Sequence, residues 1–201
     1  MSFNFTNVLC FGRYILGSCL GGSEVIALGY IVNIIYASNK IGDGIGDAVR
    51  VLISNDLGAK NFKRVNNVAA HGLVIIIVIS IIMPLITIPL IGYVCDILTI
   101  GAYSDLIFAY LLMPLGFIFF QLTTSYFAEV MGSEGDTIRP SIILIFGNML
   151  NLIFDPIFMF HFGMGMFGAG LASVVSYFVS FLLFLYIFYY RADTSVKISF
   201  F

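Results

Sequence analysis

Charge is scarce in this sequence: Asp, Glu, Lys and Arg make up only 10% of its 201 residues, against about a quarter in a soluble globular domain. Hydrophobic residues make up 60%, and the mean hydropathy is +1.05. A chain of this composition lacks the polar side chains needed to cover a water-exposed surface, so the sequence predicts a membrane protein. The net charge of −2 and the lack of a basic stripe exclude a nucleic-acid partner.

Cysteine is also sparse. The three cysteines, Cys10, Cys19 and Cys95, are odd in number and form no CxxC pair, so neither a disulfide framework nor a zinc site is indicated. The amino terminus lacks the basic start of a secretory signal, and Arg13 interrupts its first apolar stretch. We therefore expect the chain to enter the bilayer through its own helices.

Catalytic motifs are missing from the sequence as well. It contains no HExxH, no GxxxxGK[ST] and no GxSxG. Its two histidines, His71 and His161, fall on opposite sides of the membrane in the topology given below. We therefore expect the protein not to be an enzyme and to need no cofactor.

Apolar stretches of about 20 residues, enough to cross a bilayer, occur six times. They cover residues 3–20, 25–57, 68–93, 106–128, 141–160 and 166–190. The first, with Asn4, Asn7 and Arg13, suggests a span cut short at its start. The second carries SNKIGDGIGDAVRVLISNDLG and predicts either one long kinked helix or a helix with an interrupted lower half. We expect an all-α polytopic membrane protein, a single membrane domain over residues 1–201 built as a six-helix bundle.

The basic residues indicate the orientation. Lysine and arginine collect in cytoplasmic connections, and the connections 58–67, 129–140 and 191–201 carry Lys60, Lys63, Arg64, Arg139, Arg191 and Lys197. The three connections on the other side carry none. This bias predicts a cytoplasmic amino terminus and a multi-pass protein of the cell membrane.

A polar group interrupts the apolar run FGNMLNLIFDPIFMF. Asn148, Asn151 and Asp155 are spaced i, i+3 and i+7, so they share one helical face. An acid at bilayer depth costs at least about 2.5 kcal/mol, so this face must point into the bundle. Pro156 cannot donate a hydrogen bond to the carbonyl of Leu152. These oxygen atoms could bind Na⁺ or hold a proton; alternatively, the two asparagines neutralise the acid and fix the helix register.

A second polar group lies in the second span. Asp43, Asp47 and Arg50 are spaced i, i+4 and i+7, so the arginine can pair with Asp47. Gly42, Gly44 and Gly46 would let a neighbouring helix or a substrate come close. Because this stretch lies near the inner surface, where self-pairing is easy, we interpret Asp43 and Asp47 only as auxiliary residues. Arg13 is a further candidate partner for one of these acids.

Small residues form a stripe on the sixth span. They are Ala169, Ser173, Ser176 and Ser180, at steps of four, three and four. Such a stripe is a helix contact or a pore lining, and packing is the favoured interpretation. We also expect Pro84 and Pro89 to bend the third span, and Pro114 to bend the fourth.

Three stretches together resemble one protein family. ISNDLGAKNFKRVNN, MGSEGDTIRPSIILIFGNMLNLIFDPIF and GMFGAGLASVVS are similar to the amino-terminal half of multidrug and toxic compound extrusion (MATE) transporters, from about residue 17 to about residue 190. The resemblance implies a secondary active exporter of two six-helix bundles, which expels organic cations or amphipathic compounds in exchange for Na⁺ or H⁺. By position, Asn151 and Asp155 match the family's cation-site asparagine and aspartate, and Ser173 stands where a threonine is usual.

The sequence departs from the family in two ways. The family usually has an aspartate on the first helix, near Gly12 here, but no acid occurs from Met1 to Gly22. Asp43 or Asp47 would have to compensate, with Asn148 as a further auxiliary ligand. A full member is also roughly twice this length, which implies a second bundle from the same gene, a split gene or a homodimer. A flippase for lipid-linked precursors and an inert truncated product are the alternatives.

Overall fold

The computed structural model describes residues 22–97 and 103–190, and this part of the chain is all helical. The predicted span 3–20 lies outside it. The elements are α2 (Gly22–Gly58), α3 (Phe62–Ile97), α4 (Ser104–Gly116), α5 (Ile118–Ser133), α6 (Ile138–Pro156), the π-helix η2 (Ile157–His161) and α7 (Gly165–Tyr190). The prediction of an all-α bundle is confirmed.

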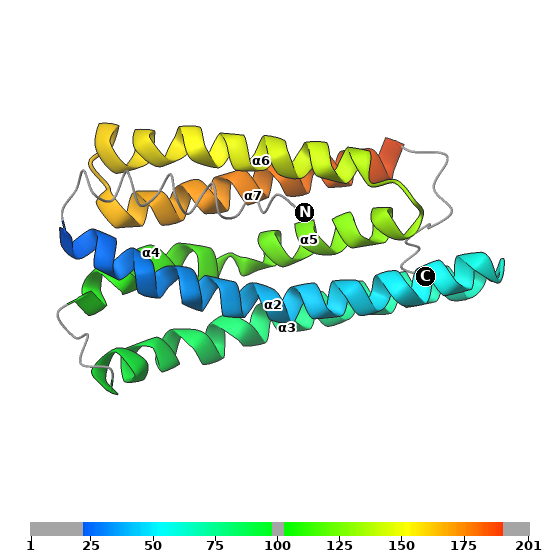
Figure 1. Cartoon of the computed structure of the whole chain (residues 1–201), viewed down its shortest axis with the longest axis horizontal. Helices are drawn as coiled ribbons and strands as arrows, with labels where there is room; N and C mark the ends of the chain where they lie inside the picture. The colour runs from blue at the N-terminus through cyan, green and yellow to red at the C-terminus, as the bar shows by residue number, and fades with distance from the viewer. Residues whose placement is uncertain (1–21, 98–102, 191–201) are drawn as a thin grey trace.

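The helices run along one long axis, as Figure 1 shows. Helices α6 and α7 lie along one side of the bundle, α2 and α3 along the other, and α4 and α5 between them. Helix α2 packs on α5 and α3, whereas α7 packs on α4, α5 and α6. Four helices of the described part are long and apolar enough to cross a membrane, and the bent pair α4–α5 makes a fifth candidate.

Helix α2 is unbroken over 37 residues, including its glycine-rich part. Gly42 and Gly46 are buried there because α5 lies against them. A β-carbon on Gly42 would overlap Leu122, and one on Gly46 would lie 3.0 Å from Cγ of Glu129. The glycines therefore allow α5 to approach closely, and the alternative of an interrupted lower half is excluded.

The fourth span is broken where proline predicts a bend. Helices α4 and α5 meet at an angle of 52°. Pro114 cannot donate a hydrogen bond to the carbonyl of Tyr110, and Gly170 of α7 packs so close that a β-carbon there would overlap the same carbonyl oxygen. Pro84 and Pro89 lie inside α3, which continues as one helix to Ile97, and the bends expected at these prolines stay a prediction.

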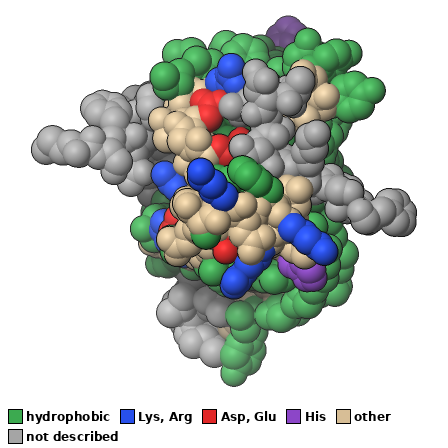
Figure 2. Space-filling view, turned by 90° about the vertical axis from the view of Figure 1, so that its right-hand side faces the viewer, with side chains coloured by type: hydrophobic (Ala, Val, Ile, Leu, Met, Phe, Trp, Pro, Cys, Tyr) green, Lys and Arg blue, Asp and Glu red, His purple; other side chains and the backbone are tan. Residues whose placement is uncertain are grey.

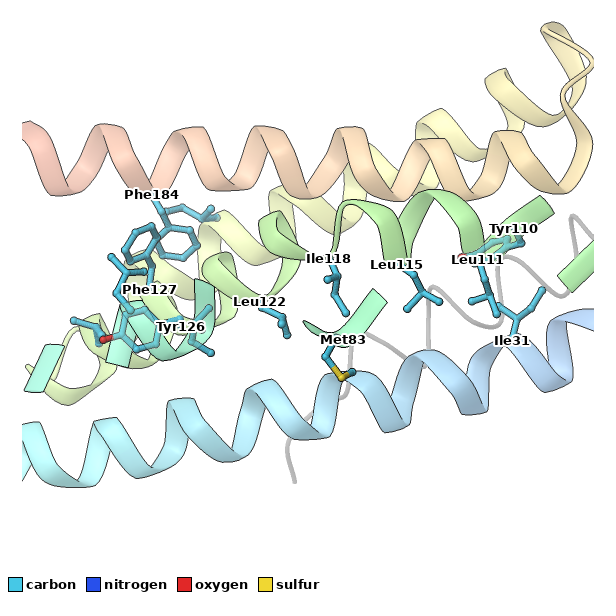
Figure 3. Packing of buried hydrophobic residues seen from close by; sticks show 14 of the residues in the cluster. Ile31, Met83, Tyr110, Leu111, Leu115, Ile118, Leu122, Tyr126, Phe127 and Phe184 are labelled. Atoms are coloured by element: carbon cyan, nitrogen blue, oxygen red, sulfur yellow. The ribbon is translucent and has the colours of Figure 1, made fainter. Parts of the chain in front are cut away.

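Buried apolar side chains form a line between the two sides of the bundle (Figure 3). Its members include Ile31, Leu111, Leu115, Ile118, Leu122, Phe127 and Phe184. The rings of Phe127 and Phe188 lie 4.9 Å apart between α5 and α7. Large apolar side chains on the outer faces are exposed, such as Leu85 at 70%, as expected for helices that meet lipid.

Basic side chains gather at one end of the bundle. The turn between α2 and α3 and the connection between α5 and α6 lie at the same end in Figure 1, and Figure 2 views that end and shows its lysines and arginines. Lys60, Lys63, Arg64 and Arg139 are all exposed. Two of the three predicted inner connections therefore share one end, as alternating spans require, and the third, 191–201, lies outside the described residues. The side of the membrane on which this end lies stays a prediction.

Candidate functional site

The buried face of α6 carries the two central residues of the predicted site. Asn151 is 4% exposed, and Asp155, one turn further along, is 1% exposed. Pro140, Ile143 and Gly147 continue this face toward the start of the helix. Asn148 is half-buried, so it lies at the margin of the face rather than at its centre.

Helix α7 covers this face and supplies the third residue. The two helices touch at two heights along their axes. In the middle of α6, a β-carbon on Gly147 would overlap the hydroxyl of Ser180 of α7. Near the start of α7, a β-carbon on Gly168 would lie 2.7 Å from the carbonyl of Phe158, just after α6. Asn151 and Asp155 lie between these levels on α6. Ser173 lies between them on α7 and is 4% exposed. The structure therefore brings Asp155, Asn151 and Ser173 to the same part of one helix interface.

The serine hydroxyl has a defined orientation. The Oγ of Ser173 donates to the carbonyl of Ala169, 3.1 Å away. A hydroxyl that donates its hydrogen in this way presents acceptor lone pairs to its other neighbours. Ser173 can therefore contribute an oxygen ligand at the α6–α7 interface.

The backbone changes its geometry directly after the acid. Helix α6 ends at Pro156, and residues Ile157–His161 continue as a π-helix, in which the N–H of Phe162 donates to the carbonyl of Ile157 over 3.1 Å. Single π-turns are rare and occur frequently at functional sites. Asp155 thus stands at the junction between two helix geometries.

The donor set limits the ligand. A carboxylate, an amide and a hydroxyl oxygen are hard ligands, which suit Na⁺ or a proton and not a soft transition metal. Within residues 22–97 and 103–190, no cluster of three His, Cys, Asp or Glu side chains could hold a metal ion. A buried carboxylate in an apolar bundle is stable only when a cation, a proton or hydrogen bonds compensate its charge.

The carboxyl-terminal part of the small-residue stripe on α7, at Ser176 and Ser180, is a packing surface. Ser176 and Ser180 are buried, and each donates to the carbonyl four residues earlier, over 2.8 and 3.0 Å. Gly147 of α6 packs against both residues. The interpretation of the stripe as a helix contact is confirmed for this part of it.

The predicted pairing of Arg50 with Asp47 is wrong. Arg50 Nη1 instead contacts Oε2 of Glu129 on α5 over 2.9 Å, and Asp47 is exposed. The reason is the close packing of α5: a β-carbon on Gly132 would lie 3.4 Å from Cζ of Arg50, so the guanidinium lies on α5 rather than along its own helix.

Glu129 belongs to a row of polar contacts, here called the α2–α5 seam. On α5 its members are Gln121, Ser125, Glu129 and Ser133, at steps of four; on α2 they are Asn39, Asp43, Arg50 and Ser54. Asp43 accepts from Lys40 over 3.0 Å and from Ser125 over 3.4 Å. The four-residue spacing of these polar residues on α5 is visible in the sequence, and it predicts a polar helix face that would have indicated the α2–α5 seam.

The structure therefore separates the main residues from the two auxiliary acids of α2. Asp155, Asn151 and Ser173 lie between α6 and α7. Asp43 belongs to the interface of α2 with α5, and Asp47 lies on the exposed side of α2. Within the described part, neither acid of α2 belongs to the α6–α7 interface.

Comparison with known proteins identifies the fold and the family. The family model MatE matches residues 5–157. The chain is 28% identical over 184 residues to the probable multidrug resistance protein YoeA of Bacillus subtilis (strain 168). This match covers 86% of the chain and 38% of YoeA.

Solved structures agree over almost the whole chain. A multidrug resistance MATE family transporter of the MOP superfamily in its inward-facing conformation is 25% identical, with a TM-score of 0.91 over 99% of this chain and 45% of the other. A MATE protein crystallised in the bent conformation is 24% identical, also with a TM-score of 0.91, over 98% and 44%. The chain spans less than half the length of these relatives, and the matched family model shows that it belongs to the MatE family of membrane transporters.

Proposed function

We propose that this chain is the cation-binding bundle of a secondary active multidrug efflux antiporter in the cell membrane. The antiporter exports organic cations or amphipathic compounds in exchange for Na⁺ or H⁺. The observation that carries the proposal is Asp155, a carboxylate 1% exposed inside a membrane bundle. The multidrug resistance named for two of the relatives supports the substrate class.

The proposed coupling follows from the charge of the site. Asp155 is the only acidic residue in α6 and α7, so one proton or one Na⁺ balances it. The ion is held by the carboxylate, with oxygens from Asn151 and Ser173, and Asn148 at the margin. Because the bound and the empty site differ by a full charge in an apolar bundle, they favour different arrangements of the neighbouring helices.

The π-helix η2 is the element through which binding of the ion at Asp155 acts on the neighbouring helices. Pro156 deprives the carbonyl of Leu152 of its usual helical donor, and η2 follows at once. We infer that filling the site shifts the junction between α6 and η2, and that this shift changes the affinity for the exported compound. Thermodynamic linkage then requires that the compound changes the affinity for the ion by the same factor.

A second bundle completes the transporter. Alternating access needs two bundles that rock against each other around a site near the bilayer midplane. The relatives are more than twice the length of the part that matches this chain. We propose that the second bundle is carried by the same polypeptide, by the product of a split gene or by a second copy.

The test is efflux by the complete transporter that contains this bundle. Asp155→Asn keeps the shape of the side chain and removes its charge, and we expect it to lower ion-gradient-driven efflux of a cationic dye at least tenfold. Asp105→Asn is the matched control, because Asp105 is exposed in the first turn of α4. Efflux that Asp155→Asn leaves unchanged, at equal protein levels, would overturn the proposal.

A further inference from the structure

Charged residues differ in burial by their sign at the end of the bundle that Figure 2 views. The basic residues of this end are exposed, and they are Lys60, Lys63, Arg64 and Arg139. The acidic residues of this end are half-buried, and they are Asp56, Glu134 and Asp136. The outermost surface is therefore cationic, and we call its four basic residues the basic end.

Arginines cover two of these acids. Asp56 Oδ2 lies 3.4 Å from Nε of Arg64, and Asp136 Oδ2 lies 3.4 Å from Nη1 of Arg139. In both pairs the acid is the more buried partner, because its side chain is 14% or 15% exposed, against 65% and 56% for the two arginines. An anion that approaches this end from outside therefore meets a guanidinium group before it meets a carboxylate.

The two lysines of the basic end carry charge that no acid of the described part balances. Neither Lys60 nor Lys63 forms an ion pair within residues 22–97 and 103–190. Helices α3 and α6 both begin at this end, and neither has an acid in its first turn. The positive ends of these two helix dipoles therefore add to the cationic potential of the lysines.

The basic end lies at the level of the lipid headgroups. The apolar stretch 68–93 begins about 9 Å along α3 from Phe62, at 1.5 Å per residue, and the stretch 141–160 begins two residues after Arg139. The headgroup layer extends about 5–8 Å beyond the hydrocarbon core, within reach of long basic side chains. Phe62 and Ile138, 51% and 72% exposed, place apolar atoms beside these cations, which suits a surface covered by lipid.

We propose that the basic end binds the headgroups of anionic phospholipids, with Lys60 and Lys63 as the principal contacts of the headgroup phosphate. Charge complementarity carries the proposal, because basic residues next to a membrane span attract anionic lipids. Phe62 and Ile138 favour a lipid over a free phosphate ion, since only a lipid has apolar chains that can cover them. Lipid binding goes beyond the proposed transport and can be measured without it.

Spin-labelled lipids test the proposal in the complete transporter, reconstituted in phosphatidylcholine vesicles. Electron spin resonance gives the affinity for spin-labelled phosphatidylglycerol relative to spin-labelled phosphatidylcholine. We expect the parent protein to prefer phosphatidylglycerol, and Lys60→Gln with Lys63→Gln to lower this preference at least about fivefold. Lys60→Arg with Lys63→Arg keeps both charges and should keep the preference. Lys40→Gln is the control, because Lys40 lies about 27 Å along α2 from its end at Gly58.

Three results would show that the basic end is not a lipid site. The first is a parent protein with equal affinity for the two lipids. The second is a preference that the two glutamine replacements leave unchanged, or that Lys40→Gln lowers as much. The third is a preference that inorganic phosphate removes at constant ionic strength, because the surface would then bind the anion alone.

Two further measurements separate lipid binding from folding and from ion coupling. Equal melting temperatures of the glutamine and arginine variants show that the fold is intact. Asp155→Asn is expected to keep the preference for phosphatidylglycerol while it lowers dye efflux. A failed lipid site and a failed cation site therefore give different results.

Discussion

The guanidinium of Arg50 and the carboxylate of Glu129, 79 residues apart in the sequence, lie 2.9 Å apart between α2 and α5. Both side chains are partly exposed, at 43% and 26%. In an apolar environment interhelical polar contacts hold helices in register. The pair and the rest of the α2–α5 seam therefore fix α2 on α5.

Removing either charge of this pair is expected to destabilise the bundle. Arg50→Ala or Glu129→Ala leaves the other charge without its partner, and because both side chains are partly exposed we expect a cost of up to about 1 kcal/mol. The double replacement Arg50→Glu with Glu129→Arg is expected to recover most of the loss. Thermal unfolding in detergent measures the stability of each variant. If the destabilisation by the double replacement equals the sum of the effects of Arg50→Glu alone and Glu129→Arg alone, a direct pair is contradicted.

The helices could be predicted from the sequence, whereas the polar contacts between different helices could not. Composition and the length of the apolar runs determine that the chain folds as membrane helices, because an apolar chain in lipid must satisfy its backbone internally. The face shared by Asn151 and Asp155 followed from helical spacing. The partner of Arg50 did not, since Glu129 is distant in sequence and only the close packing of α5 against α2 brings it near.

Gly170 is expected to tolerate no larger side chain. A valine there would collide with the carbonyl of Tyr110 and with Pro114 at the break between α4 and α5. We expect Gly170→Val to cost about 1–3 kcal/mol, as overpacking does. Gly116→Ala is the control, because a β-carbon at Gly116 meets nothing within 4 Å. Equal melting temperatures for the two variants would show that the contact is not tight.

Ser173 allows a test of the third oxygen ligand. Ser173→Ala removes the hydroxyl, whereas Ser173→Thr keeps it and adds only a methyl group. We expect the alanine variant to lower the apparent affinity for the coupling ion about tenfold, equivalent to roughly 1.4 kcal/mol, and the threonine variant to stay close to the parent protein. The measurement is dye efflux as a function of Na⁺ concentration and pH, and alanine and threonine variants that behave alike would exclude a ligand role.

Pro156 links the site to the π-turn. Pro156→Ala restores a backbone donor for the carbonyl of Leu152 and removes a helix-breaking residue, which costs about 3 kcal/mol in a regular helix. We therefore expect a more stable bundle but slower efflux, because the junction between α6 and η2 no longer shifts easily. Stability is read from thermal unfolding and transport from initial efflux rates. A variant that transports at the parental rate would remove the π-turn from the mechanism.

The central claim is that Asp155 binds the coupling ion, and infrared difference spectroscopy of the purified complete transporter tests it most directly. Adding Na⁺ or changing the pH should produce a carboxyl or carboxylate band that disappears in Asp155→Asn and persists in Asp105→Asn. A difference spectrum that Asp155→Asn leaves unchanged would contradict the account, because another group would then hold the ion.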